Sequence, residues 1–401
     1  MFDYSSLRRF PDVEAPNLQA WDATDELLVR RALDAGVPGE QIAVIGDEYG
    51  AITLALADAG LRGLRTHQDL VTGRRALANN ARALDLGDAF TSHELDESLL
   101  TGARTVLLQL PKELAALAEI ADAVARWASP DVVLIAGGRV KHMTLAQNEV
   151  LARFFDAVQP QRGERKSRLI RASDPLPVSA EPPAPTRQKH DGFVLCAFGG
   201  AFAGAKLDIG TRALLDALPE LSAAVPPQLR RSGPARPATA PDPASDDEIS
   251  GVVAGRGLRV VDLGCGTGAL AVAFALQNPD ATITATDRSA SAVRSARATV
   301  AANGLEGRIA VTLDDAGFEL ADGETDVVLL NPPFHLGASV HEGAGHRLIE
   351  AAARLLRPGG EVWTVFNSHL DHRRVLSREV GRTEQILRTP KFTVTRSIKR
   401  R

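Results

Sequence analysis

Short runs of apolar residues alternate along the chain with longer stretches in which apolar residues recur every three or four positions. The short runs are typical of strands buried in a parallel sheet, and the longer stretches of amphipathic helices that cover its faces. In the C-terminal half the predicted strands are 259–263, 282–286, 309–313, 326–330 and 361–366. The helices predicted between them are 269–277, 289–302 and 344–356. The pattern predicts an α/β fold with helices on both faces of a mainly parallel sheet.

The end of this half carries signals of its own. Pro358, Gly359 and Gly360 are expected to stop the preceding helix, so that the next strand begins at residue 361. Two late strands near 384–387 and 392–397 are expected to close an antiparallel edge of the sheet.

The N-terminal half repeats this plan less faithfully. Residues 45–51 match 263–269, and residues 108–111 match 330–333, which suggests a duplicated domain. The first copy has Glu48 in place of the central glycine, and Val44 where the second copy has Asp262. We therefore expect two tandem class I (Rossmann-like) domains, the first a degenerate scaffold or RNA-holding unit and the second catalytic. The alternative is that any two doubly wound domains look this similar.

Two stretches rich in proline and polar residues divide the chain. Residues 173–191 are predicted to be a linker between domains at 1–172 and 192–401. Residues 225–248 have the same character and are predicted to be an insertion in a surface loop of the second domain.

Composition narrows the class of protein. Of the 401 residues, 44% are hydrophobic and 24% charged, which is typical of a soluble globular protein. Two cysteines cannot build a disulfide framework and indicate a reducing compartment. No apolar run approaches the roughly 20 residues of a membrane helix, and the first residues do not read as a signal peptide. We expect a cytoplasmic protein with no membrane and no metal partner.

The charge balance limits how RNA could be bound. The net charge is −4 and the pI about 6.2, so there is no global positive field to attract nucleic acid. Arg162, Arg165, Lys166, Arg168 and Arg171 form one local basic patch, and residues 371–401 carry ten Lys or Arg against three acids. Each patch could equally be a solvated face.

A glycine loop follows the strand at 259–263. Gly264, Gly266 and Gly268 allow a sharp turn and a close approach of ligand to backbone. The loop also satisfies a dinucleotide fingerprint. Asp262 just before it would repel a pyrophosphate, whereas it would attract the ammonium of an amino-acid ligand. This favours S-adenosylmethionine over a nicotinamide cofactor.

Three further carboxylates follow the next two strands. Asp287 ends the second strand and is placed to accept both ribose hydroxyls. Asp314 and Asp315 follow the third strand and could reach the adenine amine, or could simply form a polar turn.

Asn331, Pro332, Pro333 and Phe334 follow a strand buried on both faces and are the candidate catalytic residues. They are therefore expected at the carboxyl edge of the sheet, beside the glycine loop. The Asn331 side-chain oxygen and the Pro332 carbonyl can accept the two hydrogens of a planar amine. This would hold the nitrogen in line with a sulfonium methyl, so that orientation and charge stabilisation supply the acceleration. Phe334 offers a face on which a flat substrate can stack.

On these motifs the chain resembles the bacterial ribosomal RNA guanine-N2-methyltransferases, and most closely the large-subunit enzyme. The residues that carry the likeness are 7–11, 18–23, 110–112, 135–138, 207–211, 260–268, 331–335 and 391–392. The resemblance implies tandem methyltransferase-like domains of which only the second is catalytic. It also implies S-adenosylmethionine as cofactor and ribosomal RNA or a ribosomal subunit as partner, with the chain acting as a monomer.

The resemblance also implies roles for residues that no motif reasoning reached. Asp208, Gly210 and Thr211 become candidate cofactor contacts near its amino-acid end, and His335 would line the base pocket or cap the next helix. Residues 202–204 are Phe-Ala-Gly where the family usually has Phe-Ser-Arg. This removes a basic residue near the expected RNA entrance.

Several alternatives remain open. The target could be a guanine of small-subunit RNA, and an adenine-N6 methyltransferase is possible in principle. A protein glutamine-N5 methyltransferase uses a similar Asn-Pro-Pro loop, but commonly with tyrosine after it and with a helical first domain. A noncatalytic RNA-binding protein on this fold is disfavoured by the intact Asp262 and Asn331. A nicotinamide dehydrogenase fits worst, because no acid for hydride transfer is evident.

Overall fold

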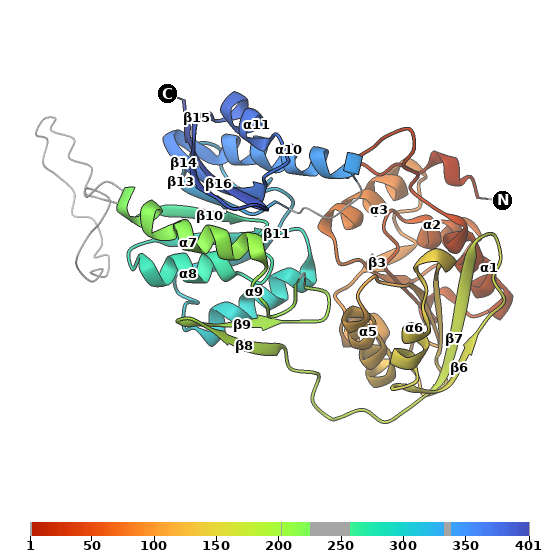
Figure 1. Cartoon of the computed structure of the whole chain (residues 1–401). Coiled ribbons are helices and arrows are strands. Elements are labelled where there is room, and N and C mark those ends of the chain that lie inside the picture. The colour runs from red at the N-terminus through yellow and green to blue at the C-terminus, as the bar shows by residue number, and fades with distance from the viewer. Residues whose placement is uncertain (1, 202, 225–256, 333–337, 401) are drawn as a thin grey trace, which may run out of the picture.

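The computed structural model describes residues 2–201, 203–224, 257–332 and 338–400 (Figure 1). The predicted insertion at 225–248 lies outside the described residues. Two α/β domains lie side by side, the first drawn in red to yellow and the second in green to blue. Among the described residues no helix combines the length and the hydrophobicity needed to cross a bilayer.

The first domain is a seven-stranded sheet flanked by helices. Its strands are β1 (Ile42–Ile45), β2 (Leu64–His67), β3 (Phe90–Ser92), β4 (Thr105–Gln109), β5 (Val133–Arg139), β6 (Phe155–Pro160) and β7 (Ser167–Pro175). Its helices are α1 (Ala23–Ala35), α2 (Ala51–Asp58), α3 (Val71–Ala83), α4 (Glu97–Leu100), α5 (Leu114–Trp127) and α6 (Leu145–Leu151). The strand order is β3-β2-β1-β4-β5-β7-β6, with β7 antiparallel to its neighbours.

The second domain repeats this sheet strand for strand. Its strands are β10 (Arg259–Leu263), β11 (Thr282–Asp287), β12 (Ile309–Leu313), β13 (Thr325–Leu330), β14 (Leu356–Asn367), β15 (Gly381–Arg388) and β16 (Phe392–Lys399). Its helices are α7 (Ile209–Ala224), α8 (Ala269–Gln277), α9 (Ala290–Ala302), α10 (Ala338–Leu355) and α11 (His372–Glu379). The order β12-β11-β10-β13-β14-β16-β15 is that of the first sheet, so the predicted tandem class I fold is confirmed.

A hairpin connects the two sheets. β8 (Thr186–His190) and β9 (Phe193–Ala197) pair antiparallel, and β9 packs beside α9 of the second domain. The stretch predicted as a linker, 173–191, therefore contributes its first residues to β7 and its last residues to the hairpin. Only its middle connects one regular element with the next.

One predicted boundary is wrong for a clear reason. The helix before Pro358 begins at Ala338 and ends at Leu355, where 344–356 was predicted. β14 already begins at Leu356 and runs through Pro358, Gly359 and Gly360. The register of β14 shifts at this point against β13. A Cβ on Gly360 would lie 3.0 Å from the carbonyl oxygen of Thr325. The glycine is therefore needed for close strand packing at an irregularity, and not for a turn.

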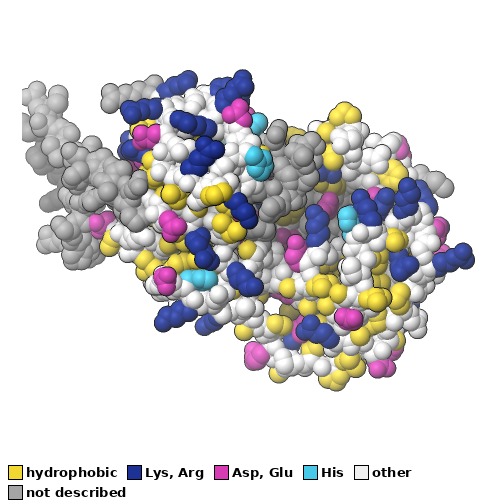
Figure 2. Space-filling view, viewed as in Figure 1, with side chains coloured by type: hydrophobic (Ala, Val, Ile, Leu, Met, Phe, Trp, Pro, Cys, Tyr) yellow, Lys and Arg dark blue, Asp and Glu magenta, His cyan; other side chains and the backbone are white. Residues whose placement is uncertain are grey.

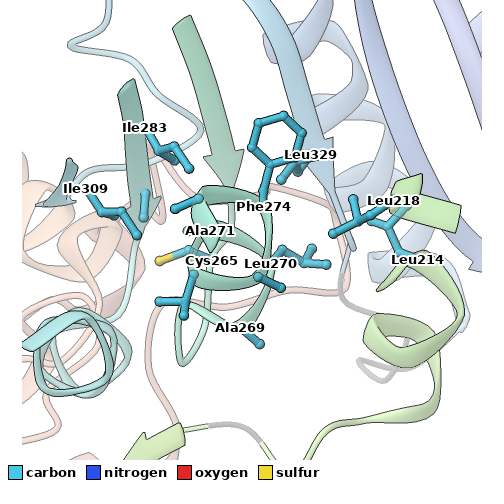
Figure 3. Close-up of a cluster of buried hydrophobic side chains, with 14 of the residues drawn as sticks. Leu214, Leu218, Cys265, Ala269, Leu270, Ala271, Phe274, Ile283, Ile309 and Leu329 are labelled. Carbon is cyan, nitrogen blue, oxygen red and sulfur yellow. The ribbon is translucent and has the colours of Figure 1, made fainter. Parts of the chain in front are cut away.

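Packing around α8 fixes the start of the glycine loop's helix. Residues Ala269 to Ala275 of α8 are all buried, and Phe274 and Leu270 pack between the sheet and Leu214 and Leu218 of α7 (Figure 3). A helix that is apolar on every side has to be sandwiched in this way. Because α8 is fixed on all sides, the end of the glycine loop that leads into it is fixed as well.

The two domains meet through equivalent residues. Leu70 after β2 forms an isolated antiparallel bridge with Ser289 after β11. The Val71 amide donates to the Arg288 carbonyl at 2.8 Å, and the Ala290 amide donates to the Asp69 carbonyl at 2.9 Å. Because Leu70 and Ser289 occupy the same place in their domains, this contact has the form of an isologous dimer interface within one chain.

Candidate active site

The glycine loop between β10 and α8 leaves open space beside its backbone. Gly264, Gly266 and Gly268 have φ angles of 77°, 55° and 79°, which a residue with a side chain adopts only under strain. A Cβ on Gly266 would meet no atom within 4 Å, whereas one on Gly268 would lie 3.2 Å from Cβ of Ala296. Gly266 thus leaves room for a ligand, and Gly268 allows α8 and α9 to pack.

Asp262 lies under this loop with one carboxylate oxygen unused. Its Oδ2 accepts a hydrogen bond from the Ala271 amide at 3.0 Å. Its Oδ1 is buried and has no partner among the described residues. Burial raises the pKa of Asp262 to about 7. A buried carboxyl of this kind is completed by a cation, which fits the ammonium group of S-adenosylmethionine.

Asp287 stabilises the same loop and keeps capacity for a ligand. Its Oδ2 accepts from the Gly266 amide at 2.9 Å, and its Oδ1 accepts from the Ser289 amide at 2.9 Å. Each carboxylate oxygen has a second lone pair, so both can still accept a ribose hydroxyl. Burial raises the pKa of Asp287, while the two amide hydrogen bonds act in the opposite direction.

Asp314 and Asp315 are nearly buried and are already engaged by arginines. Arg75 of the first domain reaches Asp314 at 3.2 Å, and Asp314 also accepts from the Glu319 amide at 2.8 Å. Asp315 pairs with Arg347, and burial raises the pKa of Asp315. Sequence reasoning found the two carboxylates but missed both arginines. Nothing local in the sequence connects Arg75 with a strand end more than 200 residues away.

Asn331, directly after β13, is held by residues at the start of α7. Its Nδ2 donates to Thr211 Oγ1 at 2.9 Å and lies 3.4 Å from Asp208 Oδ2. The Thr211 hydroxyl donates to Asp208 Oδ2. Asp208 Oδ1 accepts from the amides of Gly210 and Thr211 at 2.8 and 3.1 Å. Asp208, Gly210 and Thr211, expected as cofactor contacts, thus form a network around Asn331.

This network fixes the orientation of the Asn331 amide. An ionised Asp208 only accepts hydrogen bonds, and Thr211 gives its one hydroxyl hydrogen to Asp208. Asp208 Oδ2 and Thr211 Oγ1 must therefore both accept from a donor, which in Asn331 is the NH2 group. The carbonyl side is turned away, and Oδ1 is buried without a partner among the described residues. Pro332 is buried beside it, whereas Pro333, Phe334 and His335 lie outside the described residues.

The first domain keeps this arrangement with altered residues. By sheet register Gln109 corresponds to Asn331, and Gln68 corresponds to Asp287. Gln109 Nε2 donates to Asp25 at 2.5 Å, as Asn331 does to Thr211. Glu48 stands in the place of Gly266. The scaffold of the site is therefore duplicated, but Glu48 and Gln68 replace two of the residues predicted to bind the cofactor. The first domain keeps a buried carboxyl of its own, that of Asp47, which accepts from the Thr53 amide at 2.7 Å.

Comparison with known proteins agrees with this division. Residues 240–396 match the family described as "Methyltransferase small domain", and residues 2–176 match the "RLMG N-terminal domain". A solved 16S rRNA N2 methyltransferase of T. thermophilus, in complex with AdoMet and guanosine, has a similar fold. Its TM-score is 0.71 at 20% identity, with 97% of each chain covered. The fold and the site thus define an S-adenosylmethionine-dependent methyltransferase with a second, degenerate copy of its domain.

Curated relatives show to which family of methyltransferases the chain belongs. The Ribosomal RNA large subunit methyltransferase G of Stutzerimonas stutzeri is 32% identical over 99% of this chain and 98% of that protein. The protein of the same name from Streptomyces avermitilis is 31% identical over 98% of this chain and 97% of that protein. The chain belongs to the family of ribosomal RNA large subunit methyltransferases G, which confirms the family expected from the sequence.

Proposed function

We propose that this protein transfers the methyl group of S-adenosylmethionine to the exocyclic N2 amine of a guanine in large-subunit ribosomal RNA. One observation gives the main support for an amine as the methyl acceptor. Asn331 presents a buried amide oxygen without a partner in the described part of the chain, and its NH2 group is held from behind by Thr211 and Asp208. An oxygen presented in this way accepts an N–H hydrogen of the substrate.

The cofactor supplies an electrophilic methyl group on a sulfonium, and the chain supplies the geometry. Asp262 offers its free Oδ1 to the cofactor's ammonium, and Asp287 offers its remaining lone pairs to the ribose. Asn331 Oδ1 accepts one amine hydrogen, and we assign the second to the Pro332 carbonyl. Orientation in a site without bulk water is the main contribution, together with stabilisation of positive charge that develops on the nitrogen. The N–C bond would form as the sulfonium S–C bond breaks, which leaves a neutral thioether, and the proton that the nitrogen gives up would pass to water when the methylated base leaves.

The pairing of a target base in RNA has to be broken before the base can reach Asn331. Unstacking costs a few kcal/mol, and phosphate contacts are a common source of that energy. Figure 2 shows Lys and Arg side chains over both domains of the visible face, with Asp and Glu among them. RNA binding therefore has to rely on local groups and not on a uniformly basic surface.

Both basic patches have part of their charge paired, and the C-terminal patch has more, because Arg374, Arg378 and Arg382 each form an ion pair there. In the C-terminal patch Arg396 pairs with Glu361 and Glu384. In the first patch Arg165 pairs with Glu26. Because ion pairing lowers the charge available to phosphates, we assign the RNA path to neither patch. Changing Arg165, Lys166 and Arg168 together to serine should therefore leave the salt dependence of RNA binding unchanged, and a slope flatter by about two units would show that the path crosses the first patch.

The experiment for the function uses large-subunit RNA from cells that lack the gene. The purified protein and labelled S-adenosylmethionine are expected to yield N2-methylguanosine at a defined position, and Asn331→Ala is expected to lower the rate by about 100- to 1000-fold. Cofactor affinity of the variant should equal that of the parent. Methylation of small-subunit RNA or of a glutamine peptide, with large-subunit RNA left unmodified, would overturn the proposal.

We also propose that the protein acts as a monomer at the ribosome, in the cytoplasm. The isologous contact around Leu70 and Ser289 already joins two copies of the domain within one chain, so this surface is not available to a second chain. Light scattering during gel filtration should therefore give a mass near 42.6 kDa. A mass twice as large at working concentrations would refute this part of the proposal.

A further inference from the structure

The side chain of Asp69 in the first domain reaches the start of a helix in the second domain. Asp69 lies two residues after β2, and its Oδ2 accepts from the Ser289 hydroxyl at 2.6 Å. Its Oδ1 accepts from the Ser291 amide at 2.8 Å. Ser289 precedes α9 and Ser291 lies in its first turn, where amide hydrogens have no partner within the helix. Asp69 therefore caps α9 from the other domain, as an N-cap residue caps its own helix.

The start of α9 in turn orients Asp287. The Ser289 amide donates to Asp287 Oδ1 at 2.9 Å, and the Gly266 amide donates to Asp287 Oδ2 at 2.9 Å. The carboxylate is thus held between two amides, one in the glycine loop and one in the segment that Asp69 holds. A shift of Ser289 would turn the remaining lone pairs of Asp287 away from the positions of the ribose hydroxyls.

The support given by the Asp69 side chain runs in one direction only. By sheet register Asp69 corresponds to Arg288 of the second domain. The backbone hydrogen bonds from Val71 to the Arg288 carbonyl and from Ala290 to the Asp69 carbonyl are therefore reciprocal. The side chains are not, because arginine has only donors and cannot accept amide hydrogens. The first domain, whose own site is altered, thus holds the domain that carries the predicted cofactor residues.

We infer that Asp69 is a positioning residue of the cofactor site, which holds Ser289 so that Asp287 can accept both ribose hydroxyls of S-adenosylmethionine. The inference rests on the ribose contact proposed for Asp287. It makes the first domain a part of the cofactor site through a side chain that does not touch the cofactor.

The negative charge of Asp69 cannot produce the same effect. Burial raises the pKa of Asp287, and the nearby carboxylate of Asp69 raises this pKa further. On charge alone, removal of Asp69 would favour the ionised form of Asp287. A weaker ribose contact after removal of Asp69 therefore reports a loss of geometry.

The experiment is calorimetry on the full chain with two ligands. One is S-adenosylhomocysteine, which lacks the sulfonium charge, and the other is its analogue without the two ribose hydroxyls. The parent should bind the second ligand about 10-fold or more weakly, because charge-assisted hydrogen bonds to Asp287 are lost. Asp69→Ala should weaken binding of the first ligand by about 2- to 12-fold, the equivalent of one hydrogen bond, and leave the second unchanged. A general loosening of the fold would weaken both ligands to the same extent.

A conservative variant separates the hydrogen bonds of Asp69 from its charge. Asp69→Asn keeps an oxygen that can accept from the Ser291 amide. Its NH2 group can donate to the Ser289 oxygen, whose own hydrogen can turn to the Ser291 hydroxyl at 2.9 Å. Asp69→Asn should therefore bind both ligands like the parent.

The matched control removes a different carboxylate from the contact between the domains. Glu119 of α5 pairs with Arg294 and accepts from the Gly199 amide at 2.9 Å. Glu119→Ala should bind both ligands like the parent, because neither contact leads to Asp287. In an Asp287→Ala background, addition of Asp69→Ala should cause no further loss, since the side chain that Asp69 positions is already absent.

Ser289→Ala removes the same link from the side of the second domain and should give the selective loss even if Asp69→Ala does not fold. Unchanged affinity for S-adenosylhomocysteine in these variants, or an equal loss for the two ligands, would overturn the inference. A selective loss of the same size in Glu119→Ala would overturn it as well. If Asp287→Ala binds S-adenosylhomocysteine like the parent, the proposed ribose contact fails and the inference fails with it. None of these outcomes decides on methylation of the guanine amine, which is tested separately with RNA and Asn331→Ala.

Discussion

Substitution of Thr211 tests how the site works, because it distinguishes two roles for the same residue. Sequence resemblance assigns Thr211 to the cofactor, whereas the structure shows its hydroxyl oxygen accepting from Asn331 Nδ2 at 2.9 Å. Thr211→Val keeps the shape of this buried side chain and removes the oxygen. Asp208 still caps α7 through the amides of Gly210 and residue 211. The helix should therefore stay in place while Asn331 loses its orientation.

The expected magnitude follows from the contacts that are lost and kept. A neutral hydrogen bond contributes about 0.5 to 1.5 kcal/mol, which corresponds to a fall in kcat of about 2- to 12-fold. The longer contact between Asn331 and Asp208 at 3.4 Å remains, so the loss should be far smaller than in Asn331→Ala. Thr211→Ser keeps the hydroxyl and should restore most of the rate.

The assay is single-turnover methylation of large-subunit RNA, with the cofactor dissociation constant measured separately by calorimetry. If Thr211 positions Asn331, Thr211→Val lowers the rate constant and leaves the dissociation constant unchanged. If the dissociation constant rises several-fold and the rate at saturating cofactor equals that of the parent, Thr211 is a cofactor contact. That result would refute the positioning role.

Three more predictions concern the cofactor site. Asp287→Ala should weaken S-adenosylmethionine binding by about 1.5 to 3 kcal/mol for each charge-assisted hydrogen bond lost. If calorimetry gives an unchanged dissociation constant, Asp287 only stabilises the glycine loop and does not contact the cofactor. The pKa of Asp262 is raised by burial to about 7, above the ~3.9 of an unfolded chain. The folded protein without ligand therefore binds the extra proton, and its stability should decline as pH rises from about 4 through about 7. Thermal unfolding over this range should show that decline in the parent and a flatter profile in Asp262→Asn. Arg75→Ala should leave Asp314 buried without its arginine and weaken cofactor binding. The control Arg31→Ala, at an exposed position on α1, should bind the cofactor like the parent. If Arg75→Ala also binds the cofactor with the affinity of the parent, Arg75 does not contribute to the site.

The parts of the fold that follow from local pattern were predicted well. β10, α8 and β12 have the predicted bounds, because each is an apolar run ended by glycine or polar residues. β14 was predicted to begin too late, because Pro358, Gly359 and Gly360 are typical of a turn. Here a Cβ on Gly360 would lie 3.0 Å from the carbonyl oxygen of Thr325 in the neighbouring strand, which leaves room only for glycine. No local signal distinguishes a glycine that ends a helix in a turn from one that allows two strands to pack closely, and only the position of the neighbouring strand does.

The residues of the predicted site, too, could be found from local sequence signals, but their distant partners could not. Asp262, Asp287 and Asn331 were predicted because each lies at or directly after the carboxyl end of a buried strand, and the structure places all three at one edge of the sheet. The contact between Asn331 and Thr211 joins residues 120 positions apart, and the pairing of Arg75 with Asp314 joins residues 239 apart. Nothing in the sequence near either residue marks its partner. A role was expected for Thr211 from resemblance, but its contact with Asn331 required the structure.

The first domain keeps the form of the site and also contacts the second domain. Its Gln109 is held by Asp25 as Asn331 is held by Thr211, although Glu48 and Gln68 stand in place of Gly266 and Asp287, two of the residues predicted to bind the cofactor. Arg75 of the first domain reaches Asp314 of the second, and by register the equivalent residue Arg294 pairs with Glu119 of the first. Each domain thus supplies an arginine to a carboxylate of the other, and through Arg75 the first domain contacts Asp314 of the predicted cofactor site.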